Sequence, residues 1–373
     1  MQKHAKKNKK VFCALSGGID SSTTYLLLNK AQIDVYPVFI DHGLMRIIRG
    51  MEERDHIKEI FPDVNILDIR DQFLPVILGE GDAEGKRKLF KKAYSDTISK
   101  VIKEENCDLL ADGTILPDIE ESFGVKITDL KETMTIEEEL ALKKQYSKGF
   151  VKSQHNVGIE YDVEATIQPV ASLTKPEVRK VLEFLGMPES LVYRKAFPGP
   201  ALSARIVGPV TRENLAFEKK IHDLVESLVD DYYTTKHGKP MIINDAGDQE
   251  PFQVFAATIE DVLNTKVTGL LDGKRTYEVP LIVNAQWDFE KLTNLAKEIK
   301  NYARVFYQLS HRLEGKYDVV IRSINSSDAR TATVTNLPIA LLNELRDKLL
   351  QFPETKNVYY DVTSKPPATI EYV

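Results

Sequence analysis

A serine- and glycine-rich segment near the N-terminus has the residue types of a phosphate-binding loop. The segment Ser16–Ser22, SGGIDSS, supplies two adjacent glycines, three hydroxyl groups and the carboxylate of Asp20. The glycines allow the backbone to turn tightly and to bring its N–H groups close to an anion. The hydroxyl groups can bind phosphate oxygens, and Asp20 could hold Mg²⁺. The segment therefore predicts a site for a nucleotide polyphosphate.

The sequence on either side of this loop predicts a strand before it and a helix after it. Val11–Leu15 is an apolar run, and Ser21–Lys30 has a helical pattern. A helix that begins at the loop adds free N–H groups and a partial positive charge, which favour a bound anion. The chain contains no G-x-x-x-x-G-K-[ST] motif, so this is not a Walker A loop. The alternative is an ordinary strand-to-helix turn with two glycines.

Apolar strands alternate with helical segments through the N-terminal part of the chain. The further predicted strands are Val35–Ile40, Asn65–Ile69 and Asp108–Ala111. This alternation predicts an α/β fold with a doubly wound parallel sheet and helices on both faces. Ligands of such sheets bind at the carboxyl ends of the strands, where the loop and the Asp41–Gly43 turn both lie.

The composition excludes several classes of protein. A length of 373 residues favours two domains. The net charge of −6 argues against tRNA or DNA as the main partner, because nucleic-acid-binding surfaces are usually basic. Cys13 and Cys107 lack the spacing of a zinc site and fit a reducing compartment. Since no stretch is long enough to cross a membrane, we expect a cytoplasmic protein without a membrane partner.

Charged and polar segments follow the predicted strands of the first domain. A run of cations opens a helix that reaches about residue 105, and it is either a solvated face or an anion site: Lys86, Arg87, Lys88, Lys91 and Lys92. Residues 123–150 are charged with weak periodicity, which predicts a mobile lid. Lys152 and His155 follow it in one polar cluster. Thr174–Glu177 is a capping box that predicts the start of a helix.

A smaller α+β domain is predicted to follow the rigid FPGP loop, with the boundary near residue 205. The two domains are thus 1–205 and 206–373. After a helix over Arg212–Tyr232, one strand–helix–strand order occurs twice, which suggests an internal duplication. The first copy is Tyr277–Asn284, Phe289–Lys300 and Val305–Leu309, and the second is Tyr317–Asn325, Pro338–Leu350 and Val358–Val362. Pro366 and Pro367 stiffen the C-terminal tail and would fix Lys365 and Glu371.

Separated motifs along nearly the whole chain resemble the ATP-pyrophosphatase part of GMP synthetase. They are SGGIDSS at 16–22, FIDHGLMR at 39–46, EGKRK at 84–88, GTILPDIEES at 113–122, KSQHNVG at 152–158, LTKPEVR at 173–179, YRKAFPGPALSARIVG at 193–208 and TSKPPATIE at 363–371. The resemblance implies an adenine nucleotide α-hydrolase-like domain with a pyrophosphate loop, followed by a GMP synthetase C-terminal domain.

The same resemblance implies a reaction and a set of site residues. XMP, ATP and ammonia would give GMP, AMP and pyrophosphate through an adenylyl-XMP intermediate, with Mg²⁺. Asp20, as the metal ligand, and Lys152 would be catalytic. The implied ATP contacts are Ser16, Gly17, Gly18, Ile19, Asp20, Ser21, Ser22, Val38 and Gly113. The implied XMP contacts are Arg87, Lys365, Ile370 and Glu371, of which Arg87 and Lys365 suit its phosphate.

No glutaminase domain precedes the loop, so the chain resembles the two-subunit arrangement in which a separate glutamine amidotransferase supplies ammonia. The suggested duplication leaves a homodimer and a monomer both open. The sequence also departs from the family pattern at Gln154, Lys195, Ala196 and Ala201. Ala201 replaces a glycine, which would matter most if the backbone there has a positive φ.

Three alternative functions share the pyrophosphate loop. A tRNA-modifying enzyme is expected to have a basic surface and often has paired catalytic cysteines. The net charge of −6 and the unpaired Cys13 and Cys107 argue against that function. NAD synthetase lacks the FPGP and SKPPATIE segments. A non-catalytic nucleotide-binding module would show a damaged loop, whereas SGGIDSS is complete.

Overall fold

A computed structural model describes residues 9–123, 161–240, 252–271, 273–299, 301–326 and 331–372. The predicted lid at 123–150, apart from its first residue, lies outside these ranges, as do Lys152, Gln154 and His155. The chain divides into two compact units, neither of which is one continuous segment. As far as these stretches are described, unit 1 comprises Met1–Asp41, Arg54–Ile69 and Lys92–Arg194, and unit 2 comprises His42–Glu53, Arg70–Lys91 and Lys195–Val373. The division into domains 1–205 and 206–373 stays a prediction.

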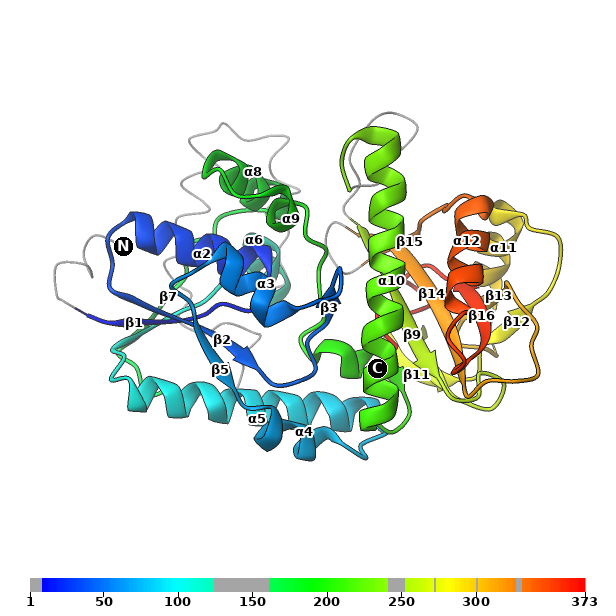
Figure 1. The fold of residues 1–373 in the computed structure, drawn as a ribbon, viewed down its shortest axis with the longest axis horizontal. Helices are drawn as coiled ribbons and strands as arrows, with labels where there is room; N and C mark the ends of the chain where they lie inside the picture. The colour runs from blue at the N-terminus through cyan, green and yellow to red at the C-terminus, as the bar shows by residue number, and fades with distance from the viewer. Residues whose placement is uncertain are drawn as a thin grey trace. The chain divides into compact units, whose positions relative to one another are not determined.

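A five-stranded parallel sheet forms the centre of unit 1 (Figure 1). Its order is β5-β2-β1-β6-β7, with bounds β1 (Val11–Ala14), β2 (Val35–Asp41), β5 (Asn65–Asp68), β6 (Leu109–Ala111) and β7 (Ala165–Ile167). The chain runs outward from β1 to β5 and then returns to the other side of β1. This reversal of strand order between β1 and β6 is the switch point at which doubly wound sheets bind ligands. The predicted α/β class is confirmed.

Helices cover both faces of this sheet. Figure 1 shows α2 and α3 on one face and α5 on the other. The bounds are α2 (Ile19–Lys30), α3 (Glu53–Ile60), α5 (Ala83–Glu104), α6 (Leu116–Phe123), α8 (Lys175–Phe184) and α9 (Glu189–Val192). The central strand β1 is apolar on both sides, and Val11 and Phe12 are fully buried. Burial on both faces explains why these strands are continuous apolar runs in the sequence.

Unit 2 is built on a seven-stranded mixed sheet. Its order is β12-β13-β16-β14-β9-β8, with β15 beside β14. The strands are β8 (Ile206–Val207), β9 (Phe252–Ile259), β12 (Leu281–Val283), β13 (Val305–Gln308), β14 (Tyr317–Asn325), β15 (Thr333–Val334) and β16 (Thr355–Asp361). Two small antiparallel pairs accompany it, β3 (Ile47–Ile48) with β4 (Met51–Glu52), and β10 (Val267–Leu271) with β11 (Lys274–Glu278).

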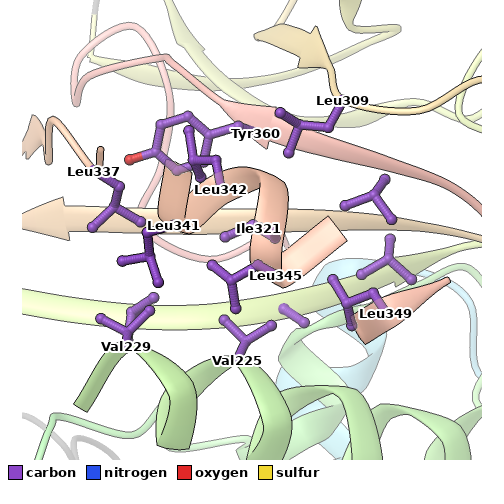
Figure 2. Close-up of a cluster of buried hydrophobic side chains, with 14 of the residues drawn as sticks. Val225, Val229, Leu309, Ile321, Leu337, Leu341, Leu342, Leu345, Leu349 and Tyr360 are labelled. Carbon is purple, nitrogen blue, oxygen red and sulfur yellow. The ribbon is translucent and has the colours of Figure 1, made fainter. Parts of the chain in front are cut away.

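The long helix α10 (Arg212–His237) supplies one side of the main core of unit 2. A Thr211–Asn214 capping box starts it, and Gly238, at φ 74°, ends it. Five of its buried side chains recur every four residues and form one apolar stripe: Phe217, Ile221, Val225, Val229 and Tyr233. They meet leucines of α12 (Ile339–Leu349) and apolar residues of β14 and β16 (Figure 2). The described residues also form α4 (Arg70–Ile77), α11 (Phe289–Glu298) and the 3₁₀ helix η3 (Ala201–Ala204).

The predicted strand–helix–strand order is present twice in unit 2. The strands that flank α11, β12 and β13, pair in parallel, and so do the strands that flank α12, β14 and β16. The two copies meet through antiparallel pairing of β13 with β16. One predicted strand is wrong: Tyr277–Asn284 is divided between β11 and β12. Pro280 lies between them and has no N–H group for a sheet ladder, which explains the break.

In the described part of the chain, no helix combines the length and the apolar character that crossing a membrane requires.

Two departures from the family pattern have visible structural consequences. Ala201 is buried and has φ 53°, a left-handed conformation that an alanine adopts only with strain. Lys195 is buried as well and forms an ion pair with Asp230 of α10. Burial raises the pKa of Asp230 to about 6, although Lys195 counteracts this rise. Lys195 therefore has a built partner, whereas Ala201 retains strain that glycine would relieve.

We predict that Ala201→Gly is much better tolerated than Ala204→Gly, a matched change in the same 3₁₀ helix. Both alanines are 1% exposed, so each substitution removes one buried methyl group and adds unfolded-state entropy. Only at position 201 does glycine relieve left-handed strain, which is worth about 1–2 kcal/mol. Urea unfolding should show a loss at least about 1 kcal/mol smaller for Ala201→Gly. Equal losses would show that Ala201 is not strained.

Candidate functional site

The glycine-rich loop in unit 1 leaves the start of a helix open. The Leu15 N–H donates to the Val38 carbonyl oxygen (2.8 Å), which anchors the end of β1 against β2. Gly18 is the N-cap of α2, and no side chain among the described residues caps this helix. The hydroxyl groups of Ser16 and Ser21 hydrogen-bond to each other at 3.0 Å beside it. An open helix N-terminus flanked by hydroxyl groups is an anion-binding arrangement, as the sequence predicts.

Two glycines permit the close packing of this region. Gly17 has φ +79°, and a Cβ atom there would lie 2.9 Å from Cδ1 of Ile57. A Cβ atom on Gly113, just after β6, would lie 3.1 Å from the backbone nitrogen of Ser21. Gly113 thus joins the end of β6 to the first turn of α2 at the switch point of the sheet. Any larger side chain at Gly113 would push these two elements apart.

Asp20 has one oxygen in an ion pair and one without a partner. Its Oδ2 atom accepts from the ammonium group of Lys175. Its Oδ1 atom is buried and has no hydrogen-bond partner within the part of the chain that the structure describes. A buried carboxylate oxygen without a donor is costly, so this atom is suited to a ligand. Asp20, in the first turn of α2, therefore has one carboxylate oxygen that a ligand at the loop could use.

The residues present fit a Mg²⁺ ion. Within the described residues there is no group of three histidine, cysteine or acidic side chains that could hold a metal by themselves. Mg²⁺ commonly takes one or two carboxylates and completes its ligands with water and substrate phosphates. The unpartnered oxygen of Asp20 beside the open helix start provides this kind of site. That Mg²⁺ binds at this site stays a prediction.

Lys175 is a site candidate that sequence reasoning missed. The capping box is confirmed, since Glu177 accepts from both the backbone N–H and the hydroxyl group of Thr174 at 2.7 Å. The neighbouring Lys175 begins α8, and the sequence patterns gave it no role, yet it contacts Asp20. A cation at a helix N-terminus opposes the helix dipole. That unfavourable placement within the LTKPEVR motif is the signal that could have revealed it.

Arg194 is a second cation beside the loop. Its Nη2 atom lies 3.2 Å from the position that a Cβ atom on Gly17 would take, and the residue is buried. Arg179 of α8 holds the backbone before and at this residue, because it donates to the carbonyl oxygens of Val192 and Arg194. The glycine loop is thus flanked by Lys175 and Arg194, two charges that oppose those of a polyphosphate.

The other implied ATP contacts in unit 1 are mostly buried. The side chains of Ile19, Ser22 and Val38 are 4%, 0% and 2% exposed, respectively. The hydroxyl group of Ser22 has no hydrogen-bond partner among the residues described. Val38 instead contributes its carbonyl oxygen to the anchor of Leu15. Their direct contact with ATP stays a prediction.

The implied XMP contacts lie in unit 2, and three of them belong to one C-terminal segment, residues 363–371, which we call the tail. Lys365 exchanges two backbone hydrogen bonds with Ala332 (2.8 and 3.0 Å), and Pro367 accepts from the Leu270 N–H (2.6 Å). Ile370 and Glu371 are half-buried, and Glu371 forms an ion pair with the buried Arg205 at 3.3 Å. The tail is therefore fixed to its own unit along its length, as the two prolines predict.

Arg87 is the fourth implied XMP contact and lies near the start of α5. It is half-buried and pairs with Glu84 at 2.7 Å, and Glu84 also contacts Arg275. The neighbouring Lys86 is fully buried and donates to the Ile206 carbonyl oxygen at 2.5 Å. Burial lowers the pKa of Lys86 to about 7. Lys86 is therefore a structural residue and not part of a solvated cationic face.

The Asp41–Gly43 turn does not present its histidine to solvent. His42 is buried beside Phe73 and Phe90, with ring centroids 5.1 and 5.0 Å away. Its Nδ1 atom accepts from the Leu44 N–H at 3.2 Å. Burial, and to a lesser extent Lys219, lowers the pKa of His42 to about 3. His42 is therefore a neutral packing residue at physiological pH.

Comparison with known proteins decides the family. One subunit of the glutamine-hydrolyzing GMP synthase of Saccharolobus solfataricus is 31% identical, over 98% of this chain and 94% of the relative. This chain belongs to the family of that GMP synthase subunit. The corresponding protein of Methanocaldococcus jannaschii is 30% identical over 98% of this chain and 93% of its own length. The family model "GMP synthase C terminal domain" matches residues 310–372, which include the tail.

Two further matches differ in how much of the relative is covered and in how similar it is. A protein named GMP synthase [glutamine-hydrolyzing] from Pyrobaculum aerophilum is 32% identical, and this chain matches only 58% of its length. Among solved structures, NMN synthetase from Francisella tularensis has 13% identity and a TM-score of 0.32 over 54% of this chain and 76% of its own. Membership of the GMP synthase family makes this chain a ligase.

We predict that Lys175→Met weakens Mg–ATP binding about tenfold or more. A charge-assisted hydrogen bond to phosphate is worth about 1.5–3 kcal/mol, and the substitution removes one of the two cations that the described residues place beside the loop. Titration calorimetry measures the effect, with Lys180→Met, an exposed lysine of the same helix, as the control. Unchanged or tighter binding would show that Lys175 only neutralises Asp20.

We predict that His42 makes the folded state less stable in acid. Its pKa falls from 6.5 to about 3 on folding, so below pH 6.5 the unfolded chain binds a proton that the folded chain does not. This histidine's contribution to the unfolding free energy is constant above pH 6.5 and falls by about 1.4 kcal/mol per pH unit toward pH 3. His42→Asn, which retains an acceptor for Leu44, should flatten the profile between pH 6 and about 4.5. Parallel profiles would contradict the assignment.

Proposed function

We propose that this chain is the synthetase component of a two-subunit GMP synthase. It would convert XMP, ATP and ammonia into GMP, AMP and pyrophosphate. The observation that supports this most strongly is a complete SGGIDSS loop with an open helix start, in a chain of the GMP synthase family. The relatives are named as one subunit of a glutamine-hydrolyzing enzyme, which supports a separate glutamine amidotransferase as the source of ammonia.

The first step would be the adenylation of XMP. The 2-oxygen of xanthine attacks the α-phosphorus of ATP, a P–O bond forms, and the bond to the β-phosphate bridging oxygen breaks to release pyrophosphate. The open N–H groups of α2 and the hydroxyl groups of Ser16 and Ser21 bind the leaving pyrophosphate. Lys175 and Arg194 neutralise its charge. A bound Mg²⁺, held by Asp20 and phosphate oxygens, would screen the negative charge of the polyphosphate.

The second step would be the displacement of AMP by ammonia at C2 of the purine. The C2–N bond forms, the C2–O bond breaks so that AMP leaves with the oxygen, and the ammonia nitrogen loses one proton to give the 2-amino group of GMP. Arg87 and Lys365 would bind the XMP phosphate, and Ile370 and Glu371 would contact the rest of XMP. Lys152 would act in the first step, where it would neutralise charge at the α-phosphate that is transferred. Catalysis then comes from positioning and charge neutralisation, without a protein nucleophile.

A cytoplasmic location belongs to the same proposal. Both cysteines of the chain, Cys13 and Cys107, are buried and unpaired. Burial raises the pKa of Cys13 to about 12, so its thiol is neutral and unreactive. Unpaired thiols are usual in a reducing compartment.

We predict that the chain makes GMP, AMP and pyrophosphate in equal amounts when supplied with XMP, ATP, Mg²⁺ and ammonium alone. The two steps consume one molecule of each substrate, and external ammonia replaces the amidotransferase. Chromatographic product analysis measures the ratio. Asp20→Asn should lower turnover at least about a hundredfold, through loss of the carboxylate charge at the loop, while the exposed Asp34→Asn stays at the parent rate.

Two outcomes would contradict the proposal. ATP cleavage that does not depend on XMP would mean that another acceptor is the substrate. Formation of adenosine diphosphate would mean that the loop does not cleave ATP between its α- and β-phosphates.

A further inference from the structure

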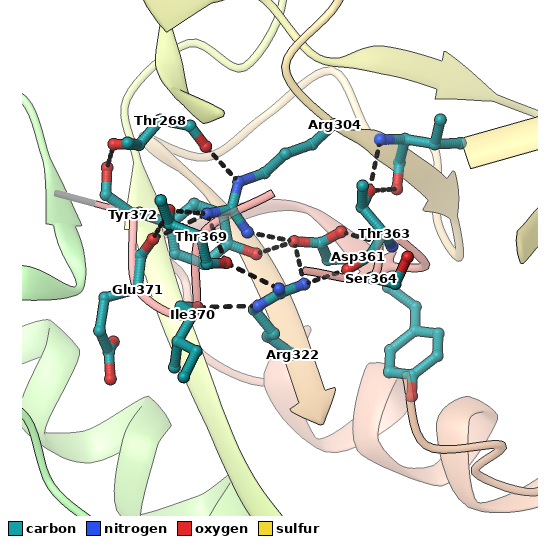
Figure 3. A network of polar contacts seen from close by, with 12 residues as sticks. Thr268, Arg304, Arg322, Asp361, Thr363, Ser364, Thr369, Ile370, Glu371 and Tyr372 are labelled. Atoms are coloured by element: carbon teal, nitrogen blue, oxygen red, sulfur yellow. Dashed lines mark hydrogen bonds and ion pairs between the residues drawn. The ribbon is translucent and has the colours of Figure 1, made fainter. Parts of the chain in front are cut away.

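Three charged side chains are completely buried beneath the tail of unit 2. Asp361, at the end of β16, accepts hydrogen bonds from Arg304 (2.8 Å) and from the hydroxyl group of Tyr372 (2.8 Å), and it forms an ion pair with Arg322 at 2.7 Å. The two arginines and Asp361 are each 0% exposed. Figure 3 shows both arginines in contact with Asp361. Burial alone would raise the pKa of Asp361, but Arg322 and Arg304 hold it below its ordinary value. Asp361 is therefore an anion between two cations.

This cluster has one positive charge more than its single carboxylate can balance. Removal of an ion from water costs several kcal/mol, and apolar residues of similar volume often stabilise a core equally well. The excess charge must therefore be compensated by dipoles. The dipoles that compensate it are backbone carbonyl groups, and most of them belong to the tail.

The two guanidinium groups donate hydrogen bonds to several carbonyl oxygens of the tail. Arg322 donates to the carbonyl oxygens of Thr363 (3.0 Å), Thr369 (2.8 Å) and Ile370 (2.8 Å). Arg304 donates to those of Thr369 (3.0 Å) and Glu371 (2.7 Å), and to the hydroxyl group of Thr369 (2.7 Å). Figure 3 shows the tail folded around both groups. Each arginine thus contacts residues at more than one point of the tail, which fixes its path.

The pattern of these bonds leaves a definite set of groups for a ligand. The carbonyl oxygens of residues 369, 370 and 371 all accept from the two arginines. A ligand therefore meets the N–H groups of this stretch and the half-buried side chains of Ile370 and Glu371. At the end of the tail, the buried Arg205 holds the carboxylate of Glu371, and it packs on Phe255 with its charged carbon 4.1 Å from the ring centroid. The conformation of the tail is set before any ligand arrives.

We propose that Arg304, Arg322 and Asp361 are positioning residues for XMP. They hold the tail in the one conformation in which Lys365, Ile370 and Glu371 are placed to bind it. None of the three needs to touch the substrate. This inference rests on the proposed function, because it takes the tail as the XMP-binding segment. A lysine cannot replace Arg322, since an ammonium group lacks the planar fork that spans three carbonyl oxygens.

The test is Arg322→Lys, which retains the charge and removes the fork. Its matched control is Arg312→Lys, another arginine of unit 2 that donates to a backbone carbonyl, that of Leu350 at 3.0 Å, outside the tail. Titration calorimetry of the full-length chain with XMP and, separately, with Mg–ATP measures both affinities. We expect the XMP dissociation constant to rise at least tenfold for Arg322→Lys, with the Mg–ATP constant changed less than twofold. Arg312→Lys should leave both constants unchanged.

A purely structural role gives a different result. If the melting temperature falls while the affinity for XMP is unchanged, the cluster only stabilises the fold and the inference is wrong. If Arg322→Lys does not fold, Tyr372→Phe tests the same point, because it removes one hydrogen bond to Asp361 and retains the packed ring. We then expect a rise of a few-fold in the XMP constant and faster amide exchange in the tail, and no change in either would overturn the inference.

The failure of the proposed function is distinguishable. If the parent chain does not bind XMP, or if Lys365→Ala leaves XMP binding unchanged, the assignment of the tail to XMP is wrong. If Lys365→Ala weakens XMP binding and Arg322→Lys does not, the assignment stands and the positioning role of the cluster is wrong.

Discussion

Backbone N–H and C=O groups that are removed from water need hydrogen-bond partners, and the two regions with candidate site residues meet this requirement in opposite ways. At the start of α2, Gly18 provides no side-chain cap, so the first N–H groups of the helix are left for a ligand. In the tail, the carbonyl oxygens of residues 369–371 are taken by buried arginines, so the chain is rigid before a ligand binds. One region supplies open donors, and the other supplies fixed geometry.

The open donors in unit 1 depend on the architecture of its sheet. The reversal of strand order between β1 and β6 separates the elements that follow these strands, and Gly113 then allows the end of β6 to contact the first turn of α2. Cations are brought to the same point by α8 and by the segment that Arg179 holds. The hydroxyl groups and the carboxylate of the loop itself are thus joined by cations from other elements.

Buried charge has a different purpose in unit 2. The core between α10, α12 and the sheet is extensive and is built from apolar side chains. Arg304, Arg322 and Asp361 instead cluster where the chain turns from β16 into the tail. Buried charges add little to the stability of a fold, but they can specify one conformation. Each buried donor is satisfied only when its acceptors take up one arrangement. The same logic explains Lys195, whose charge is matched by Asp230.

Features that depend on neighbours in the sequence were determined by the sequence itself. The strand–loop–helix around SGGIDSS, the capping box at Thr174, the long helix α10 and the repeated strand–helix–strand order are all local patterns, and the structure contains each of them. The positive φ considered for Ala201 is present as well, since a glycine position in a tight loop often means a left-handed backbone. The break at Pro280 was local too, and it was overlooked.

Contacts between distant residues were decided only by the tertiary structure. Lys175 and Asp20 are separated by 155 positions, and no periodicity or motif spacing relates them. Lys86 belongs to a run of cations that looks solvated, but folding buries it against the Ile206 carbonyl oxygen. Arg304 lies just before β13, and Arg322 lies in β14. Both contact Asp361 only because β16 lies between β13 and β14 in the sheet. A sequence encodes which groups need partners, but the packing of elements far apart in the chain decides which partners they find.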